Sequence, residues 1–231
     1  MFLPDSIIAG KIYIRLKEKD KMHTLEIRDL TKQIKDKMVL DHVSLEITNG
    51  QIIGMIGDNG SGKTMLMRAI CGLIIPTSGD ILFDGKKRTI ANPSIGAMIE
   101  NTSLFPDMTG IENLKLLAKI RQTATVSDIN QAITRVGLDP KDKRTFRKYS
   151  LGMKQRLLLA QAIMEKPDIL LLDEPTNAID QEGVQRVHEI MQEEAERGAI
   201  VLLASHISID IHSLCAKVYQ MDHGRLSEVQ V

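Results

Sequence analysis

The sequence predicts an α/β protein built on a mostly parallel sheet, with an antiparallel β subdomain and an inserted α-helical subdomain. Three observations predict this class. Apolar strands alternate with helical patterns in the last third of the chain, which is typical of parallel sheets covered by helices. The stretch IIGMIG (52–57) is apolar on both faces, as in a central parallel strand. Residues 107–148 change character and read as short amphipathic helices.

The first part of the chain predicts the β subdomain and the first element of the core. Residues 25–31 and 43–48 alternate between apolar and polar side chains, which favours antiparallel strands with one buried face. The strand at 52–57 is followed by a helix over 65–71, which we expect to end at Gly72. A turn and a short strand pair around 81–85 follow.

The middle of the chain predicts helices. Residues 112–120, 127–138 and 141–150 carry amphipathic patterns, and Ser127 is the expected cap of the second helix.

Strands and helices alternate in the rest of the chain. A helix over 157–164 precedes a buried strand over 168–174, and an amphipathic helix over 184–197 precedes a buried strand over 199–206. Residues 218–226 predict a hairpin around His223 and Gly224.

Composition limits the class of protein. The 231 residues carry 30 basic and 30 acidic side chains, so no overall charge favours a nucleic-acid partner. Cys71 and Cys215 are isolated, which is typical of a reducing cytosol. No apolar run approaches the roughly 18 residues that cross a bilayer. A regular pattern begins only near Met22, so we expect residues 1–22 to be an extension outside a domain that spans 23–231.

A glycine-rich loop follows the strand at 52–57. Residues 57–64 read GDNGSGKT and fit the pattern G-x-x-x-x-G-K-[ST] between a strand and a helix. Glycines let the backbone curl so that its N–H groups point at a polyphosphate, and the following helix adds its positive end. The predicted ATP-binding residues are Gly57, Asp58, Asn59, Gly60, Ser61, Gly62, Lys63, Thr64 and Met65. The alternative is a chance glycine-rich turn, which the strand–loop–helix context disfavours.

Two acidic residues and a histidine end buried strands farther along the chain. Asp173 and Glu174 follow the strand at 168–174, and ligands of open α/β sheets bind at the carboxyl ends of strands. Asp173 can hold Mg²⁺, and Glu174 can orient or deprotonate the water that attacks the γ-phosphate. His206 ends the next buried strand, so we expect it to point at the γ-phosphate as well. A simple acidic strand end and a structural histidine are the alternatives.

The ordered series GDNGSGKT, YSLGMKQR (149–156), LLLDEPTNAID (170–180) and His206 resembles the nucleotide-binding subunits of ATP-binding-cassette (ABC) transporters over residues 23–226. The resemblance implies a P-loop NTPase (RecA-like) core over 23–99 and 155–231, with the helical subdomain over 100–154. It implies that the signature residues Ser150, Leu151, Gly152 and Met153 act in trans, on ATP bound by the other subunit of a head-to-tail dimer. A helix N-terminus without acidic residues favours a bound phosphate, although a plain capped surface helix would have the same sequence pattern. The resemblance also implies that Asp180 lies at the interface between the two subunits of the dimer, and that His206 is the switch histidine of the family.

Four residues at three sites depart from the pattern of the family. Glu100 replaces a glutamine that touches Mg²⁺ and water; a carboxylate could still bind the metal but cannot donate a hydrogen bond. Ile34 stands where an aromatic residue usually stacks on adenine, which predicts weaker base selectivity. Leu151 and Met153 replace a glycine and a glutamine of the signature, and because Leu151 cannot easily take a positive φ, the chain must enter the helix directly.

The resemblance implies an ATPase that drives a separate transmembrane permease from the cytoplasmic face of the membrane, contacting it through residues 100–125. Lys63, Glu174 and His206 would be catalytic, and Thr64, Asp173 and Glu100 would surround Mg²⁺. The segments 99–114 and 149–160 are similar to the subgroup that transports lantibiotics and bacitracin-type peptides.

Three alternatives remain open at this point. One is a nucleotide-gated module with little hydrolysis, which Glu100 favours. Another is a soluble ABC protein acting on chromosomes or ribosomes, which usually has a heptad insertion or a second cassette. The third is a small-molecule P-loop kinase, which has no use for YSLGMKQR.

Overall fold

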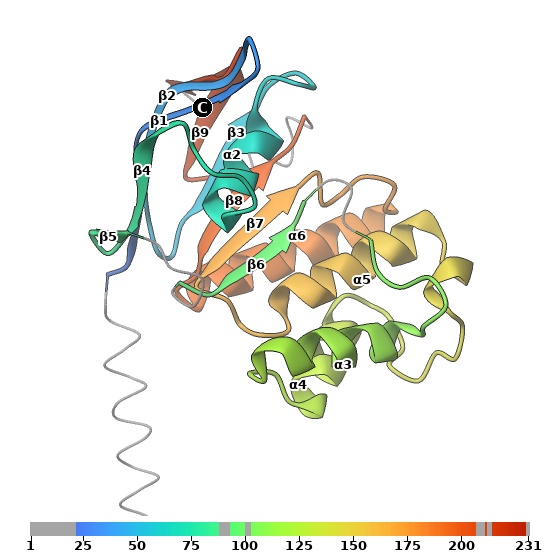
Figure 1. Cartoon of the computed structure of the whole chain (residues 1–231). Helices are drawn as coiled ribbons and strands as arrows, with labels where there is room; N and C mark the ends of the chain where they lie inside the picture. The colour runs from blue at the N-terminus through green and yellow to red at the C-terminus, as the bar shows by residue number, and fades with distance from the viewer. Residues whose placement is uncertain (1–21, 88–92, 100–102, 207–210, 212–213, 230–231) are drawn as a thin grey trace, which may run out of the picture.

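The computed structural model describes residues 22–87, 93–99, 103–206, 211 and 214–229. Its centre is a six-stranded sheet in the order β10-β9-β3-β8-β7-β6 (Figure 1). The bounds are β3 (Ile52–Ile56), β6 (Ile95–Met98), β7 (Ile169–Asp173), β8 (Ile200–Ala204), β9 (Lys217–Asp222) and β10 (Arg225–Val229). Strands β3, β6, β7, β8 and β9 are parallel, and β10 alone pairs in the antiparallel direction. The predicted α/β class and the C-terminal hairpin are confirmed.

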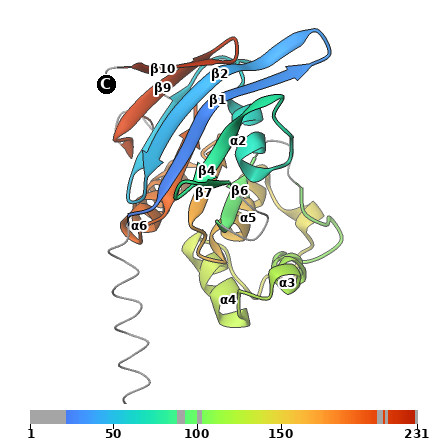
Figure 2. The same ribbon diagram turned by 60° about the vertical axis from the view of Figure 1, so that its left-hand side comes forward.

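A second, antiparallel sheet lies beside the first, in the order β2-β1-β4-β5 (Figure 2). Its strands are β1 (Thr24–Ile34), β2 (Lys37–Thr48), β4 (Ser78–Phe83) and β5 (Lys86–Lys87). The predicted strands at 25–31 and 43–48 lie within β1 and β2, which pair from Thr24 opposite Thr48 to Ile34 opposite Lys37.

Helices pack on both faces of the six-stranded sheet. They are α2 (Lys63–Cys71), α3 (Gly110–Arg121), α4 (Val126–Arg135), α5 (Leu151–Ile163) and α6 (Gln181–Glu196), with a 3₁₀ turn at Phe146–Lys148. Helix α2 ends at Gly72, which takes the left-handed conformation, as the sequence predicts. Helices α3 and α4 lie together below the sheet in Figure 1. None of the helices in the described ranges is long and apolar enough to cross a membrane.

The alternation of side chains along the parallel strands builds two cores, one on each face of the six-stranded sheet. In β7, Ile169 and Leu171 pack with α2 and the antiparallel sheet. Leu170 and Leu172 pack on the other face with the helices α5 and α6. Because both faces are covered, all five residues of β7 are buried, which explains its uninterrupted apolar sequence.

Two helix predictions are wrong. Helix α4 is capped by Thr125 rather than Ser127: the Thr125 hydroxyl accepts from the Asp128 N–H and the Asp128 carboxylate accepts from the Thr125 N–H. Residues 141–150 form only the short 3₁₀ turn. Asp142 bonds the backbone N–H of Arg144 in competition with a helix, and the N–H of Phe146 donates to the Met108 carbonyl instead of to its own turn.

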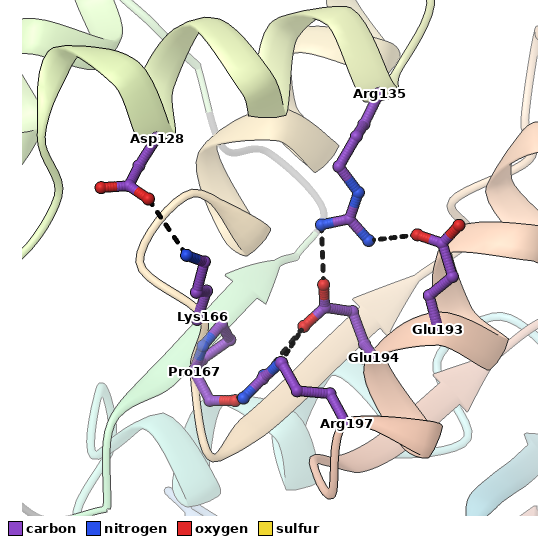
Figure 3. A network of polar contacts seen from close by, with 7 residues as sticks. All are labelled: Asp128, Arg135, Lys166, Pro167, Glu193, Glu194 and Arg197. Carbon is purple, nitrogen blue, oxygen red and sulfur yellow. Dashed lines mark hydrogen bonds and ion pairs between the residues drawn. The ribbon is translucent and has the colours of Figure 1, made fainter. Parts of the chain in front are cut away.

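A polar network joins the helical subdomain to the core (Figure 3). Arg135 of α4 donates to Glu194 of α6 at 2.8 Å and to the neighbouring Glu193 at 2.7 Å. Arg197 contacts the same Glu194 carboxylate at 2.8 Å and also donates to the Pro167 carbonyl. One buried carboxylate is therefore shared by two arginines that come from different layers of the molecule.

Candidate functional site

The glycine-rich loop lies between β3 and α2, where its backbone needs glycine. Gly57, Gly60 and Gly62 have φ values of 147°, 81° and 125°. A Cβ at Gly57 would lie 2.2 Å from the Met221 carbonyl oxygen of β9, so no larger residue fits there. Helix α2 begins directly after the loop with no acidic residue in its first turn. The amides at this end are therefore placed to attract an anion.

The side chains of the loop suit a polyphosphate. Lys63 is buried, with only 6% exposed, and its Nζ donates to the Gly57 carbonyl at 2.5 Å and the Asp58 carbonyl at 3.0 Å. The Ser61 hydroxyl is buried and has no hydrogen-bond partner within the described part of the chain. A buried cation that bonds neutral carbonyl oxygens gains from a phosphate group.

Residues far apart in sequence meet at the carboxyl ends of the strands. The Thr64 hydroxyl donates to Asp173 Oδ2 at 2.6 Å, which joins the start of α2 to the end of β7 across the intervening strand β8. Asp173 is buried. These two oxygens are hard ligands of the kind that Mg²⁺ prefers, so the residues fit that ion.

Glu174 and His206 form a second pair at the same edge. His206 Nδ1 lies 2.8 Å from Glu174 Oε2. Glu174 has a φ of 51°, and its N–H donates to the Ala204 carbonyl at 2.9 Å. A left-handed conformation is costly for a glutamate and is kept only where the surroundings fix it, which is typical of functional sites.

These groups surround one cavity of about 620 Å³. Its lining includes the residues of the loop other than Ser61, together with Met65, Asp173, Glu174 and His206. The lining also contains residues that sequence reasoning missed: Val39, Met98, Ile99, Gln155, Leu158 and Asn177. The sequence does indicate Asn177, because it lies four residues after Asp173 in the segment 170–180. Val39 and Leu158 are single apolar residues within longer apolar patterns, so nothing in the sequence sets them apart as cavity residues.

Ile34 is not among these residues. Ile34 is 44% exposed and lies at the end of β1, whereas Val39 of β2 is one of the aliphatic residues that line the cavity. Glu100 lies outside the described residues, and its predicted roles stay predictions.

The segment 149–156 starts a helix, as the sequence predicts. The Ser150 hydroxyl accepts from the Met153 N–H at 3.2 Å and caps α5. Leu151 is the first helical residue and is 62% exposed, so the chain does enter the helix directly. A Cβ at Gly152 would lie 2.8 Å from the Ala178 carbonyl, so this helix start packs closely on the turn before α6. Ser150, Leu151, Gly152 and Met153 do not line the cavity of their own chain.

Asp180, predicted to lie at a dimer seam, caps α6. Its carboxylate accepts from the Gly183 N–H at 3.1 Å. Asp180 and Gly152 thus flank the same turn, residues 178–179, at the surface beyond the cavity.

The fold and this site together define a P-loop nucleotide-binding protein. Residues 40–177 match the sequence profile of the family described as ABC transporter. The chain is 51% identical over 205 residues to an uncharacterized ABC transporter ATP-binding protein of Bacillus subtilis (strain 168), covering 87% of this chain and 94% of that protein. The chain therefore belongs to the ABC transporter family, as one of its ATP-binding subunits, which are ATPases.

Other relatives carry transport functions in their names. The chain is 35% identical over 211 residues to a bacitracin transport ATP-binding protein of Enterococcus faecalis, covering 89% of this chain and 68% of that protein. It is 34% identical over 203 residues to a lantibiotic transport ATP-binding protein of Streptococcus pyogenes, covering 87% and 88%. Among solved structures, a dimeric bacterial ABC transporter cassette has a TM-score of 0.80 at 21% identity, covering 90% of this chain and 99% of that one. The last likeness shows the fold alone.

Proposed function

We propose that this chain hydrolyses ATP to ADP and phosphate at the described cavity and thereby drives a separate transmembrane permease. The observation that carries this proposal is the Glu174–His206 pair, 2.8 Å apart, which lines the same cavity as Lys63 and the glycine-rich loop. A carboxylate beside a phosphate site has a use in hydrolysis, because it can accept the proton of an attacking water. Simple nucleotide storage would not need it.

Each residue then has a chemical task. The amides of residues 57–63 and the Lys63 ammonium hold the phosphates. Thr64 and Asp173 would hold Mg²⁺, which when bound neutralises charge on the phosphate oxygens. Glu174 orients a water and takes its proton as the water oxygen bonds to the γ-phosphorus and the bond to the β-phosphate oxygen breaks. His206 holds the Glu174 carboxylate in place.

The experiment compares phosphate release by the wild type and Glu174→Gln, each assembled with the permease. Loss of release in Glu174→Gln with retained ATP binding supports hydrolysis by this site. A wild type that is no faster than Glu174→Gln favours the alternative of a nucleotide-gated module with little hydrolysis.

We propose further that two ATP-binding subunits pair head to tail, so that Ser150 and Gly152 of one cover the ATP of the other. Three observations support the pairing: the acid-free start of α5, the exposed Leu151, and the absence of the signature residues from the cavity lining of their own chain. X-ray scattering of Glu174→Gln with ATP and Mg²⁺ should give a dimer. A monomer at saturating ATP contradicts the arrangement.

The transported substrate that we propose is an antimicrobial peptide of the bacitracin or lantibiotic kind. The support comes from the two relatives with those transport functions, together with the segments 99–114 and 149–160. The chain would then act at the cytoplasmic face of the membrane, held there by its permease. Expression with its permease in a sensitive strain should raise the inhibitory concentration of one of these peptides, and Glu174→Gln should abolish the increase. An unchanged inhibitory concentration for both peptides contradicts the substrate assignment.

A further inference from the structure

The turn of the C-terminal hairpin, residues 222–225, supports the glycine-rich loop from behind. The Gly224 N–H donates to the Ser61 carbonyl at 2.7 Å. On its other side, the Gly224 carbonyl accepts from the Asp41 N–H of β2 at 2.9 Å. The turn therefore joins the phosphate loop to β2, the strand that carries the cavity-lining residue Val39.

The bond to Ser61 sets the direction of an amide that faces the cavity. The Ser61 C=O and the Gly62 N–H belong to one planar trans peptide, so they point in opposite directions. Since the carbonyl points to Gly224, the Gly62 N–H points away from the hairpin. Gly62 lines the cavity. A hydrogen bond to the carbonyl also polarises this peptide and makes its N–H a better donor.

Position 224 strongly favours glycine. Its φ is 82°, and a Cβ there would lie 3.0 Å from the Val39 carbonyl oxygen and 3.2 Å from Leu40 Cα. Both contacts are with backbone, which cannot move without moving β2. A side chain would therefore push the turn away from β2 or from the loop.

An ion pair holds the same turn. Arg225 Nε donates to Asp41 Oδ2 at 2.7 Å, and Asp41 is the residue whose N–H bonds Gly224. The Asp41 side chain is largely covered, whereas that of Arg225 is exposed.

We propose that Gly224 is a positioning residue for ATP: through the Ser61 carbonyl it aims the Gly62 N–H at the phosphates, and the Asp41–Arg225 pair keeps it there. The inference rests on ATP binding at this loop and does not require hydrolysis. It assigns to the C-terminal hairpin a part in nucleotide affinity, although no hairpin residue lines the cavity.

The test compares Gly224→Ala with Gly85→Ala by calorimetric titration with ATP. Gly85 is a matched control, because it lies in the β4–β5 turn with a φ of 73° and a Cβ there would meet nothing within 4 Å. Both variants carry the strain of a left-handed alanine, but only one touches the loop. We expect Gly224→Ala to raise the dissociation constant for ATP about tenfold, the effect of losing one oriented hydrogen bond. Gly85→Ala should leave it unchanged.

The titration separates positioning from a folding defect. A folding defect lowers the stoichiometry of binding, whereas a misaimed amide weakens binding at full stoichiometry. If the two variants have dissociation constants within about twofold of each other, a difference below that of a typical hydrogen bond, the proposal is wrong.

If Gly224→Ala does not fold, Arg225→Ala decides the question. We expect it to raise the constant about two- to threefold, as for an exposed ion pair, and Arg225→Lys to restore most of the affinity. An unchanged constant in Arg225→Ala would then overturn the proposal. Because only binding is measured, a wild type that binds ATP without hydrolysing it would contradict the proposed ATPase activity and leave this inference standing.

Discussion

The network in Figure 3 gives a prediction in which two adjacent glutamates behave differently. Both contact Arg135, but the Glu194 side chain is 2% exposed and that of Glu193 is 60% exposed. We expect Glu194→Ala to cost much more stability than Glu193→Ala. Removing Glu194 leaves Arg135 and Arg197 without their shared carboxylate in a partly buried place, whereas removing Glu193 breaks a solvated pair.

The magnitudes follow from burial. Removing one partner of a fully buried pair costs about 3–5 kcal/mol. The guanidinium groups of Arg135 and Arg197 are 26% and 33% exposed and can be partly rehydrated, so about 2–3 kcal/mol is expected for Glu194→Ala. Glu193→Ala should cost about 0–1 kcal/mol. For a protein of this size, the larger loss lowers Tm by roughly 5–10 °C.

The assay is thermal unfolding followed by circular dichroism, with urea unfolding as a second measure of the free energy. Glu194→Gln keeps one acceptor oxygen, so its loss should fall between those of the two alanine variants. Equal losses for Glu193→Ala and Glu194→Ala would refute the reasoning, because they would mean that burial of the shared carboxylate does not matter.

Four further outcomes are expected. Glu174→Gln should lower the rate of phosphate release by about 100-fold or more while ATP still binds, as measured by release assay and titration. Lys63→Ala should abolish measurable ATP binding in the same titration, because the buried ammonium faces the phosphate cavity. Asn113→Ala should lower the free energy of unfolding in urea by about 2–3 kcal/mol, since this fully buried amide bonds the backbone of residues 105, 108 and 109. Hydrogen bonds from the Thr125 hydroxyl and N–H lower the pKa of Asp128 from 3.8 to about 2, so its stabilising effect is present above pH 4 and lost as the pH falls toward 2. The stability difference between wild type and Asp128→Asn, measured by urea unfolding, should shrink over that range.

The sequence predicts those parts of the site that are local. Residues 57–64 form the loop because their glycines and the flanking strand and helix are contiguous, and Asp173 and Glu174 end a strand whose burial is evident from its composition. The meeting of Thr64 with Asp173 also follows from a general property of parallel sheets. These features need no knowledge of how distant segments pack.

The parts that were missed depend on contacts between distant segments. Val39 lines the cavity from β2, a strand that the hydrogen bond between the Asp41 N–H and the Gly224 carbonyl joins to the C-terminal hairpin turn, and no pattern around Val39 indicates this arrangement. Residues 141–150 have helical spacing, but the backbone of Phe146 bonds Met108 across the subdomain. The cap at Thr125 is different, because the sequence TVSD (125–128) itself contains a capping box, so a local signal for this cap was present.

The strand order has a consequence for synthesis on the ribosome. Strand β3, which leads into the phosphate loop, pairs only with β8 and β9, and β8 begins 144 residues after β3 ends. At about 5–20 residues per second, β3 waits roughly 7–30 s for its first neighbour to be translated. During that interval its apolar residues are a target for chaperones, and the nascent chain cannot complete the sheet that supports its ATP site.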